Sequence, residues 1–331
     1  MKTAIVILNW NGKKLLGEFL PGVLLYSKSE AEIYVVDNAS TDDSMLFLET
    51  EFPEVKVIKN AENYGYAKGY NEGLKHIEAD LFVLLNSDVA VTENWLSPII
   101  QQFKNNPKIA AAQPKILDYK NKDYFEYAGA AGGFIDKYGY PYCRGRIFNT
   151  LEKDKGQYDE TSEIFWASGA CLFVRKDAFE QVSGFDEDYF AHQEEIDLCW
   201  RLFNLDYKVI CVNQSKVYHL GGGTLKNTNP KKTYLNFRNS LFNLLKNAPK
   251  SKITGRIFIR MLLDGIAGIQ FILSFKLSHF IAILRAHLSF YNNLRKTLQK
   301  RTIQSKKENY YHHKSIVFSY FVKQIKSFNK L

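Results

Sequence analysis

A lone carboxylate, Asp88, lies where the chain could bind a divalent cation. It ends the segment Asn86-Ser87-Asp88, directly after the most apolar strand-like run, Leu81–Leu85. A hard cation such as Mg²⁺ or Mn²⁺ that bridges a diphosphate needs only one or two protein carboxylates, because phosphate oxygens and water fill its other positions. The segment therefore predicts metal-assisted chemistry on a phosphorylated ligand.

His219 is a second candidate metal ligand. It follows a β-rich run at 208–212 and opens the glycine-rich loop Gly221–Thr224, where the backbone could approach a ligand closely. A single histidine in such a place is often structural rather than a ligand. The spacing alone leaves both interpretations open.

The segment from Glu194 to Phe203 has the spacing of an amphipathic helix with acids in its first turn. The face expected to be buried holds Ile196, Cys199 and Trp200. Glu194 and Asp197 are expected on the opposite, polar face together with Arg201, where they could form an ion pair or contact a substrate, and Glu195 is expected at the boundary. A carboxylate beside an apolar wall has a raised pKa, which suits a general base. The alternative is that these acids only complement the helix dipole.

Strand-like and helical segments alternate along the first part of the chain, which predicts an α/β fold with a mostly parallel sheet covered on both faces. Ligands of such sheets bind beyond the carboxyl ends of the strands. Three polar segments follow strands in this way: Asn9-Trp10-Asn11-Gly12, Asp37-Asn38-Ala39-Ser40 and Asn86-Ser87-Asp88. Each could simply form a turn or a helix cap, but together they favour a nucleotide site.

The charge of the chain is divided between its two parts. Residues 231–331 contain 20 Lys and Arg against two acids, whereas residues 1–230 contain 24 Lys and Arg against 33 acids. We therefore predict a catalytic domain at 1–229, with an irregular lid or acceptor-binding region at about 115–165, and a basic, helical C-terminal region at 230–331. The apolar stretch Ile253–Leu294 is interrupted by charges, which is typical of helices that lie on a membrane rather than span it. An ordinary helical subdomain with a solvated basic face remains open.

Two further features suggest a compartment. The four cysteines have no CxxC spacing and, for the most part, apolar neighbours, which predicts free buried thiols without a zinc site. The chain begins with a strand-like run and not with a signal peptide. We expect a cytoplasmic protein, peripheral on the inner face of the membrane.

At this point the ordered motifs resemble family 2 glycosyltransferases with the GT-A fold, in particular the bacterial branch that includes rhamnosyl- and galactofuranosyltransferases. The similarity covers about residues 1–245. The segment at Asp37 resembles the nucleoside-binding turn of the family, and Asn63–Gly73, with Ala67 and Asn71, resembles its donor-binding loop. Asn86-Ser87-Asp88 stands at the metal motif, with Asn in place of the first Asp.

The remaining motifs concern the acceptor and the base. Trp166, Ser168 and Gly169 lie in a segment that resembles the acceptor side, and Glu194-Glu195 stands where the family has an acidic pair whose second member is the base. The resemblance also implies that His219 completes the metal shell, and it places Glu194 and Asp197 on the acceptor side.

The resemblance implies an inverting transfer of rhamnose or a similar sugar from a dTDP- or UDP-sugar to a lipid-linked or cell-surface glycan. Mg²⁺ or Mn²⁺ on Asp88 and His219 would neutralise the leaving diphosphate, Glu195 would be the base, and Asn9, Asp37 and Asn71 would position the donor. The alternatives are a sugar-nucleotide nucleotidyltransferase and an inactive, membrane-associated binding protein. A nucleic-acid partner is suggested only by the basic tail, and an anionic membrane surface is preferred.

Overall fold

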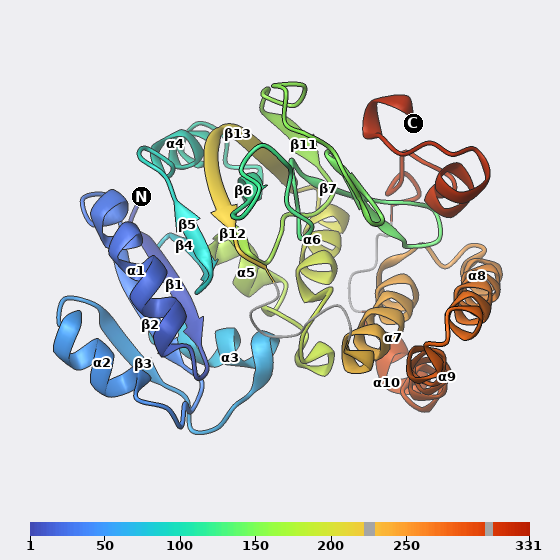
Figure 1. Cartoon of the computed structure of the whole chain (residues 1–331), viewed down its shortest axis with the longest axis horizontal. Coiled ribbons are helices and arrows are strands. Elements are labelled where there is room, and N and C mark those ends of the chain that lie inside the picture. Colours follow the sequence, from blue (N-terminus) through green and yellow to red (C-terminus); the bar gives the residue numbers. More distant parts are fainter. Residues whose placement is uncertain (222–228, 302–306) are drawn as a thin grey trace.

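The first four long strands form a parallel sheet with helical crossovers, as predicted. The structure is a computed structural model that describes residues 1–221, 229–301 and 307–331 (Figure 1). Its first elements are β1 (Thr3–Asn9), α1 (Lys13–Ser27), β2 (Glu32–Asp37), α2 (Ser44–Glu51), β3 (Lys56–Lys59), α3 (Gly65–Leu74) and β4 (Leu81–Asn86). β1 pairs in parallel with both β2 and β4, and β3 extends the sheet beyond β2.

The second part of the chain adds antiparallel strands, so that the sheet is mixed. The added elements are β5 (Val89–Val91), α4 (Ser97–Asn105), β6 (Ile109–Asp118), β11 (Ser162–Ile164), β12 (Cys171–Arg175), α5 (Lys176–Gln181) and β13 (Lys208–His219). Within the described residues the sheet has nine strands in the order β11-β13-β6-β12-β4-β1-β2-β3, with β5 paired to β13. The predicted fold class, a mixed and mostly parallel sheet flanked by helices, is confirmed.

Side chains alternate between the two faces of this sheet, and each face is buried. On β1, Ala4 and Val6 belong to one apolar cluster and Ile5 and Ile7 to the other. The first cluster lies under α3 and α6 (Glu194–Asn204), and the second lies under α1 and α4. Burial on both faces explains why these strands read as continuous apolar runs.

The irregular region at 115–165 contains short strands that the sequence pattern did not reveal. β7 (Gly133–Ile135), β8 (Pro141–Cys143), β9 (Arg146–Ile147) and β10 (Thr150–Leu151) form a small antiparallel sheet. Strands of two or three residues are too short to show a periodic pattern.

The four cysteines are free and buried.

The C-terminal region is helical, as predicted, and lies at one end of the molecule (Figure 1). It consists of α7 (Pro230–Asn247), α8 (Ile253–Leu273), α9 (Leu277–Asn292), α10 (Leu294–Gln299) and two short helical turns, Phe318–Val322 and Phe328–Lys330. In the part of the chain that the structure describes, no helix is long and apolar enough to cross a membrane. α7 packs against both α6 and α9, so it connects the catalytic part of the chain to the other C-terminal helices.

Candidate active site

Sheet pairing brings Asp88 and His219 together although 131 positions separate them. Asp88 lies in the turn between β4 and β5, and β5 pairs with the end of β13 so that Val89 lies opposite His219. The backbone N–H of Leu220 donates to the carbonyl of Asp88 at 3.0 Å. His219 Nε2 lies 3.1 Å from Asp88 Oδ1, and both side chains are buried.

Glu126 completes this cluster, and sequence analysis missed it. Its Oε2 lies 3.3 Å from Nδ1 of His219, and its side chain is buried. The N–H of Glu126 donates to the carbonyl of Ile116, which holds this irregular segment against β6. The one available signal is an acid between the aromatic residues Phe125 and Tyr127 in an otherwise apolar stretch, and such a signal does not identify a partner.

The two carboxylates of the cluster stabilise a positive charge between them. Burial would raise the pKa of Asp88, but the hydrogen bond and the charge of His219 lower it below the ordinary value. Burial would lower the pKa of His219, yet the charge of Glu126 and the hydrogen bonds to both acids raise it to about 10. The site thus stabilises positive charge between Asp88 and Glu126, and an ion that bound His219 Nε2 would replace the proton on that nitrogen.

These donors suit Mg²⁺ or Mn²⁺ shared with a diphosphate. Among the described residues no three His, Cys, Asp or Glu side chains form a closed metal shell, and such ions do not require one, since water and phosphate oxygens supply the other ligands. Asp88 and His219 Nε2 would hold the ion. Glu126 would orient the imidazole from its other nitrogen, as carboxylates commonly do behind metal-bound histidines. Residues Gly222–Thr224 of the predicted glycine-rich loop lie outside the described residues.

Asn9 and Asp37 form a polar cluster at the ends of β1 and β2, where a donor was predicted to bind. Asn9 Nδ2 donates to Asp37 Oδ1 at 3.0 Å, and the hydroxyl and N–H of Ser40 donate to the same carboxylate at 2.6 and 3.0 Å. Oδ1 of Asn9 is buried without a hydrogen-bond partner among the described residues. A buried hydrogen-bond acceptor without a partner is costly unless a ligand or water binds to it. Asn9 is therefore a good candidate for a contact with the sugar-nucleotide donor.

The polar side chains of the predicted donor loop form hydrogen bonds within the protein. Asn63 Oδ1 accepts from Asn38 Nδ2 and from the N–H of Gly65, both at 3.0 Å, and Ala67 is fully buried. Asn71 accepts from the N–H of Phe185 and donates to its carbonyl, both at 2.9 Å. The side chain of Asn71 therefore fastens α3 to the segment before the catalytic helix, and its predicted contact with the donor would have to displace these bonds.

Glu195 is the carboxylate whose surroundings best suit a base. It is partly exposed at the N-terminus of α6, and burial raises its pKa to about 7 although nearby backbone N–H groups oppose the shift. A Cβ on Gly169 would lie 3.9 Å from Cβ of Glu195 and 3.0 Å from the hydroxyl of Tyr66, so the absence of a side chain at Gly169 lets this segment pass close to both residues. The N–H of Asn86 donates to the carbonyl of Ala170 at 3.0 Å. This bond places the segment beside Glu195 at the strand end that carries Asp88.

The prediction that the polar face of α6 lies opposite its buried face is wrong, because α7 covers the polar face as well. Glu194, Asp197 and Arg201 are all buried. Asp197, not Glu194, makes the ion pairs, at 2.8 Å to both Arg201 and Lys246. Glu194 Oε2 has no hydrogen-bond partner in the described part of the chain, and burial followed by the charge of Glu195 raises the pKa of Glu194 far above its usual range. Burial therefore favours the neutral form of Glu194, whereas Glu195 is the partly exposed member of the pair.

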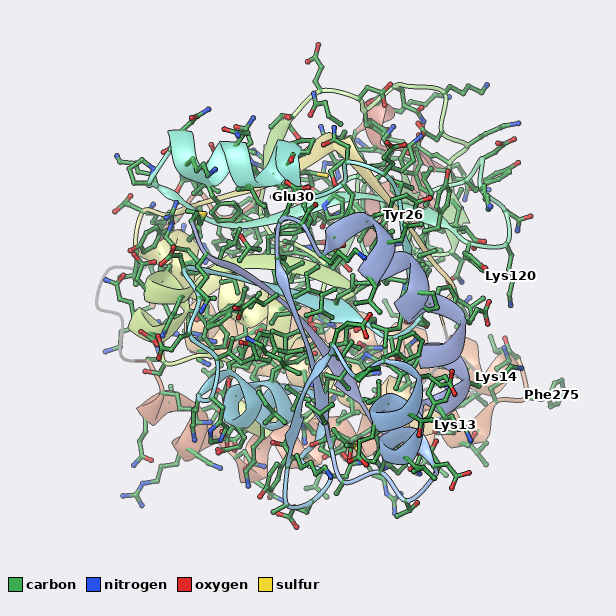
Figure 2. All side chains as sticks on the ribbon, turned by 90° about the vertical axis from the view of Figure 1, so that its left-hand side faces the viewer. Lys13, Lys14, Tyr26, Glu30, Lys120 and Phe275 are labelled. Atoms are coloured by element: carbon green, nitrogen blue, oxygen red, sulfur yellow. The ribbon has the colours of Figure 1, made fainter. Side chains whose placement is uncertain are left out.

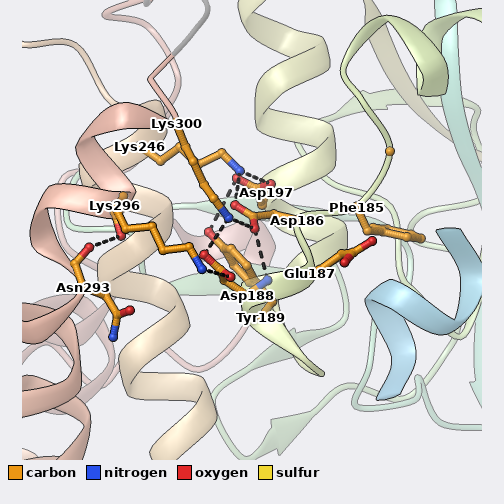
Figure 3. Close-up of polar contacts among 12 residues, drawn as sticks. Phe185, Asp186, Glu187, Asp188, Tyr189, Asp197, Lys246, Asn293, Lys296 and Lys300 are labelled. Carbon is orange, nitrogen blue, oxygen red and sulfur yellow. Dashed lines mark hydrogen bonds and ion pairs between the residues drawn. The ribbon is translucent and has the colours of Figure 1, made fainter. Parts of the chain in front are cut away.

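Lys246 also bonds to Asp186, in the segment that precedes α6. The distance is 2.7 Å, and Lys300 contacts Asp186 as well (Figure 3). Asp188 lies 2.6 Å from both Lys296 and Lys300. Four lysine contacts from the C-terminal helices thus fix the acidic turn Glu187–Tyr189 next to the catalytic helix.

Two predicted acceptor-side residues, Trp166 and Ser168, are buried behind the site. The indole N–H of Trp166 donates to the carbonyl of Phe134 at 2.9 Å, which ties the small sheet to the main one. The N–H of Ser168 donates to Gln113 Oε1 at 2.9 Å. Of the predicted acceptor segment, Gly169 is the residue that lies close to Glu195.

A strained loop leads into α6, and α7 holds it. Phe190, His192 and Gln193 all have positive φ angles, between 63° and 70°. Asn239 Nδ2 donates to the carbonyls of Ala191 and His192 at 3.0 and 2.7 Å, and Asn243 Nδ2 donates to that of Gln193 at 3.3 Å. Strained backbone persists only where its surroundings enforce it. Sequence analysis missed these asparagines.

The arrangement defines a class of protein. A mixed α/β sheet carries a polar cluster at the ends of β1 and β2, a carboxylate–imidazole pair after β4, and a partly exposed carboxylate at the start of a helix, all beyond the carboxyl ends of the strands. This is the architecture of a GT-A-type enzyme. Residues 4–183, more than half of the chain, match the family described as "Glycosyl transferase family 2". The chain belongs to this family and is a glycosyltransferase.

Relatives with assigned activities are more distant. An N-acetylglucosaminyl-diphospho-decaprenol L-rhamnosyltransferase of Mycobacterium tuberculosis is 25% identical over 233 residues, which cover 65% of this chain and 75% of the relative. The hexosyltransferase Agl10 of low-salt glycan biosynthesis in Haloferax volcanii is 23% identical over 263 residues, which cover 77% of this chain and 78% of that protein.

Solved structures agree on the fold. S. aureus TarS in complex with UDP-GlcNAc aligns with a TM-score of 0.58 and 16% identity over 92% of this chain and 90% of that one. A mannosyltransferase of Pyrobaculum calidifontis in complex with GDP-Man and Mn²⁺ aligns with a TM-score of 0.52 and 12% identity over 88% and 87% of the two chains.

Proposed function

We propose that the protein is a metal-dependent, inverting glycosyltransferase with Glu195 as its base. The observation that carries the proposal is the state of Glu195, a partly exposed carboxylate at the N-terminus of α6 with a pKa raised to about 7. A general base works best when its pKa lies near the operating pH. Burial raises the pKa of the neighbouring Glu194 well above its usual range, so Glu194 is the poorer candidate.

The reaction needs two further groups besides the base. Asn9 and Asp37 would hold the nucleoside, and Asp88 and His219 would hold Mg²⁺ or Mn²⁺. The bound cation supplies charge neutralisation of the leaving diphosphate. Glu195 removes the proton from an acceptor hydroxyl, and that oxygen attacks the anomeric carbon from the side opposite the diphosphate. One displacement without a covalent intermediate inverts the anomeric centre.

For the substrates we propose a dTDP- or UDP-sugar, with rhamnose first, and a lipid-linked or cell-surface glycan acceptor. The mycobacterial relative, named for rhamnosyl transfer to N-acetylglucosaminyl-diphospho-decaprenol, supports both choices. UDP-GlcNAc and GDP-Man complexes of proteins with this fold support a nucleotide-sugar donor in general terms. With such an acceptor the enzyme would work peripherally at the inner face of the cytoplasmic membrane.

The test is a screen of nucleotide sugars by thermal shift with Mn²⁺, followed by product analysis of the best donor. We expect one donor to raise the melting temperature in the presence of metal and to release nucleoside diphosphate on slow hydrolysis. Release of pyrophosphate from a nucleoside triphosphate and a sugar phosphate would instead identify a nucleotidyltransferase. Binding of a donor without any hydrolysis or transfer would identify an inactive binding protein.

A further inference from the structure

The helical hairpin formed by α8 and α9 presents large apolar side chains to solvent along both helices. The exposed residues on α8 are Phe258, Ile259, Leu262, Ile266, Ile269, Ile272 and Leu273, and those on α9 are Leu277, Ile281, Leu284, Leu288 and Tyr291. Phe275, in the turn between the helices, is 98% exposed and projects from the edge of the molecule (Figure 2). We call this surface the outer face of the hairpin.

The charged residues of α8 point the opposite way, into the protein. Between Ile257 and Phe275 the charged residues are Arg260 and Asp264, and both are buried. They pair with each other at 2.8 Å, and Asp264 also accepts from the hydroxyl of Tyr140 at 2.7 Å. Because the charged residues that interrupt the apolar stretch point inward, the outer face of α8 carries no charge. In an amphipathic helix of a soluble protein, the apolar face points inward and the charged face points to solvent.

Many cations of the C-terminal region are also engaged within the protein. Lys246, Lys296 and Lys300 bind the acidic turn before α6, as described above, and Arg256 pairs with Glu308 at 2.9 Å. The formal charge of this region therefore overstates the charge available to an external polyanion.

Two basic side chains that form no ion pair with a described residue lie at the base of the outer face. A groove between α7 and α9 is lined by Lys231, Tyr234 and Arg285 together with the apolar residues Ile281 and Leu288. Lys231 Nζ also lies 4.9 Å from the ring centroid of Phe190, in the strained loop before α6. A surface with apolar side chains outermost and basic ones behind them matches one leaflet of an anionic membrane, in which acyl chains lie beneath the headgroups.

We propose that the α8–α9 hairpin inserts its outer face into one leaflet of an anionic membrane, with the groove cations at the level of the headgroups. Insertion depends mainly on apolar burial, so it resists high salt, which would release a protein held by charge alone. The groove then faces the membrane and leads toward Phe190, the direction from which a lipid-linked acceptor would reach the site. The insertion itself does not depend on the proposed reaction.

The experiment is flotation of the full chain with phosphatidylglycerol–phosphatidylcholine vesicles, at 0.1 and 1 M NaCl. The test variant is Leu273→Ser with Phe275→Asn, because both side chains are exposed and Phe275 has φ +56°, which Asn tolerates. The control variant is Leu25→Ser with Leu46→Ser, which removes two side chains of similar exposure from α1 and α2. We expect the wild type and the control to float at both salt concentrations and the test variant to lose about 100-fold in partitioning. Melting temperature and metal-dependent donor hydrolysis should stay unchanged in both variants.

Three outcomes would overturn the proposal: a wild type that does not float, release of the wild type by 1 M salt, or normal flotation of the test variant. A second copy of the chain is the competing occupant of the outer face. If the test variant converted an oligomer into a monomer without any change in flotation, the outer face would be a subunit interface.

Discussion

Asn239 offers a sharp test of the idea that α7 shapes the active site. It is fully buried, and its Nδ2 lies 3.2, 3.0 and 2.7 Å from the carbonyl oxygens of Tyr189, Ala191 and His192. Asn239→Ala removes these bonds and leaves the part-buried carbonyls of Ala191 and His192 without a donor among the described residues. At about 1–3 kcal/mol for each unsatisfied group, the free energy of unfolding should fall by about 2–4 kcal/mol.

The effect on activity should exceed the effect on folding, because the released loop carries strain. Residues such as His192 in the left-handed region each store about 1–3 kcal/mol, and relaxation of the loop would displace the start of α6 and with it Glu195. We expect kcat/KM for transfer to fall by more than tenfold at a temperature where the variant is still folded.

The assay combines urea unfolding with steady-state transfer kinetics. The control is Asn236→Ala on the same helix, whose side chain makes no hydrogen bond to any described residue. That control should change the unfolding free energy by less than about 1 kcal/mol and leave kcat/KM unaltered. If Asn239→Ala unfolded at the wild-type urea concentration, or lost stability while keeping full activity, α7 would not hold the catalytic loop.

Three further predictions concern the chemistry. Because Glu195 must be ionised to act as a base and its pKa is about 7, kcat/KM should fall about tenfold per pH unit below 7; a rate that stays flat down to pH 5 would contradict this. Asp88→Ala should abolish stimulation by Mn²⁺, and full turnover of this variant in excess chelator would refute the metal assignment. Glu126→Gln should weaken Mn²⁺ binding about 10–100-fold in a calorimetric titration, and an unchanged affinity would show that Glu126 does not orient His219.

Much of the fold could be predicted from the sequence because buried parallel strands leave an unambiguous signal. Strands such as Leu81–Asn86 are buried on both faces, and the polar residues that follow them mark one edge of the sheet. Asp88 and His219 were expected to act together because of a family resemblance, and the pairing of β5 with β13 supplies the physical reason. The predicted boundary at 229/230 stays a prediction, although α7 contributes directly to the loop before α6.

The failures share one cause, which is that a helical pattern does not reveal what covers each face. The polar face of α6 was expected to form an ion pair or to contact a substrate, but Lys246 and the asparagines of α7 form a matching polar face that buries Asp197. Asn239, Asn243 and Asn247 recur every four residues, and this repeat was the available signal. The same ambiguity hid the orientation of α8, because a periodic pattern identifies two faces without showing which one points outward.

The most direct test of the central claim compares Glu195→Gln with Glu194→Gln in single-turnover transfer, with donor affinity measured in parallel. The account predicts that Glu195→Gln binds the nucleotide sugar almost normally and loses about 10²–10⁴-fold in turnover. Glu194→Gln should be much milder, because burial already favours the neutral form of Glu194. The reverse order of the two variants, or loss of donor binding together with turnover in Glu195→Gln, would contradict the assignment of Glu195 as the base.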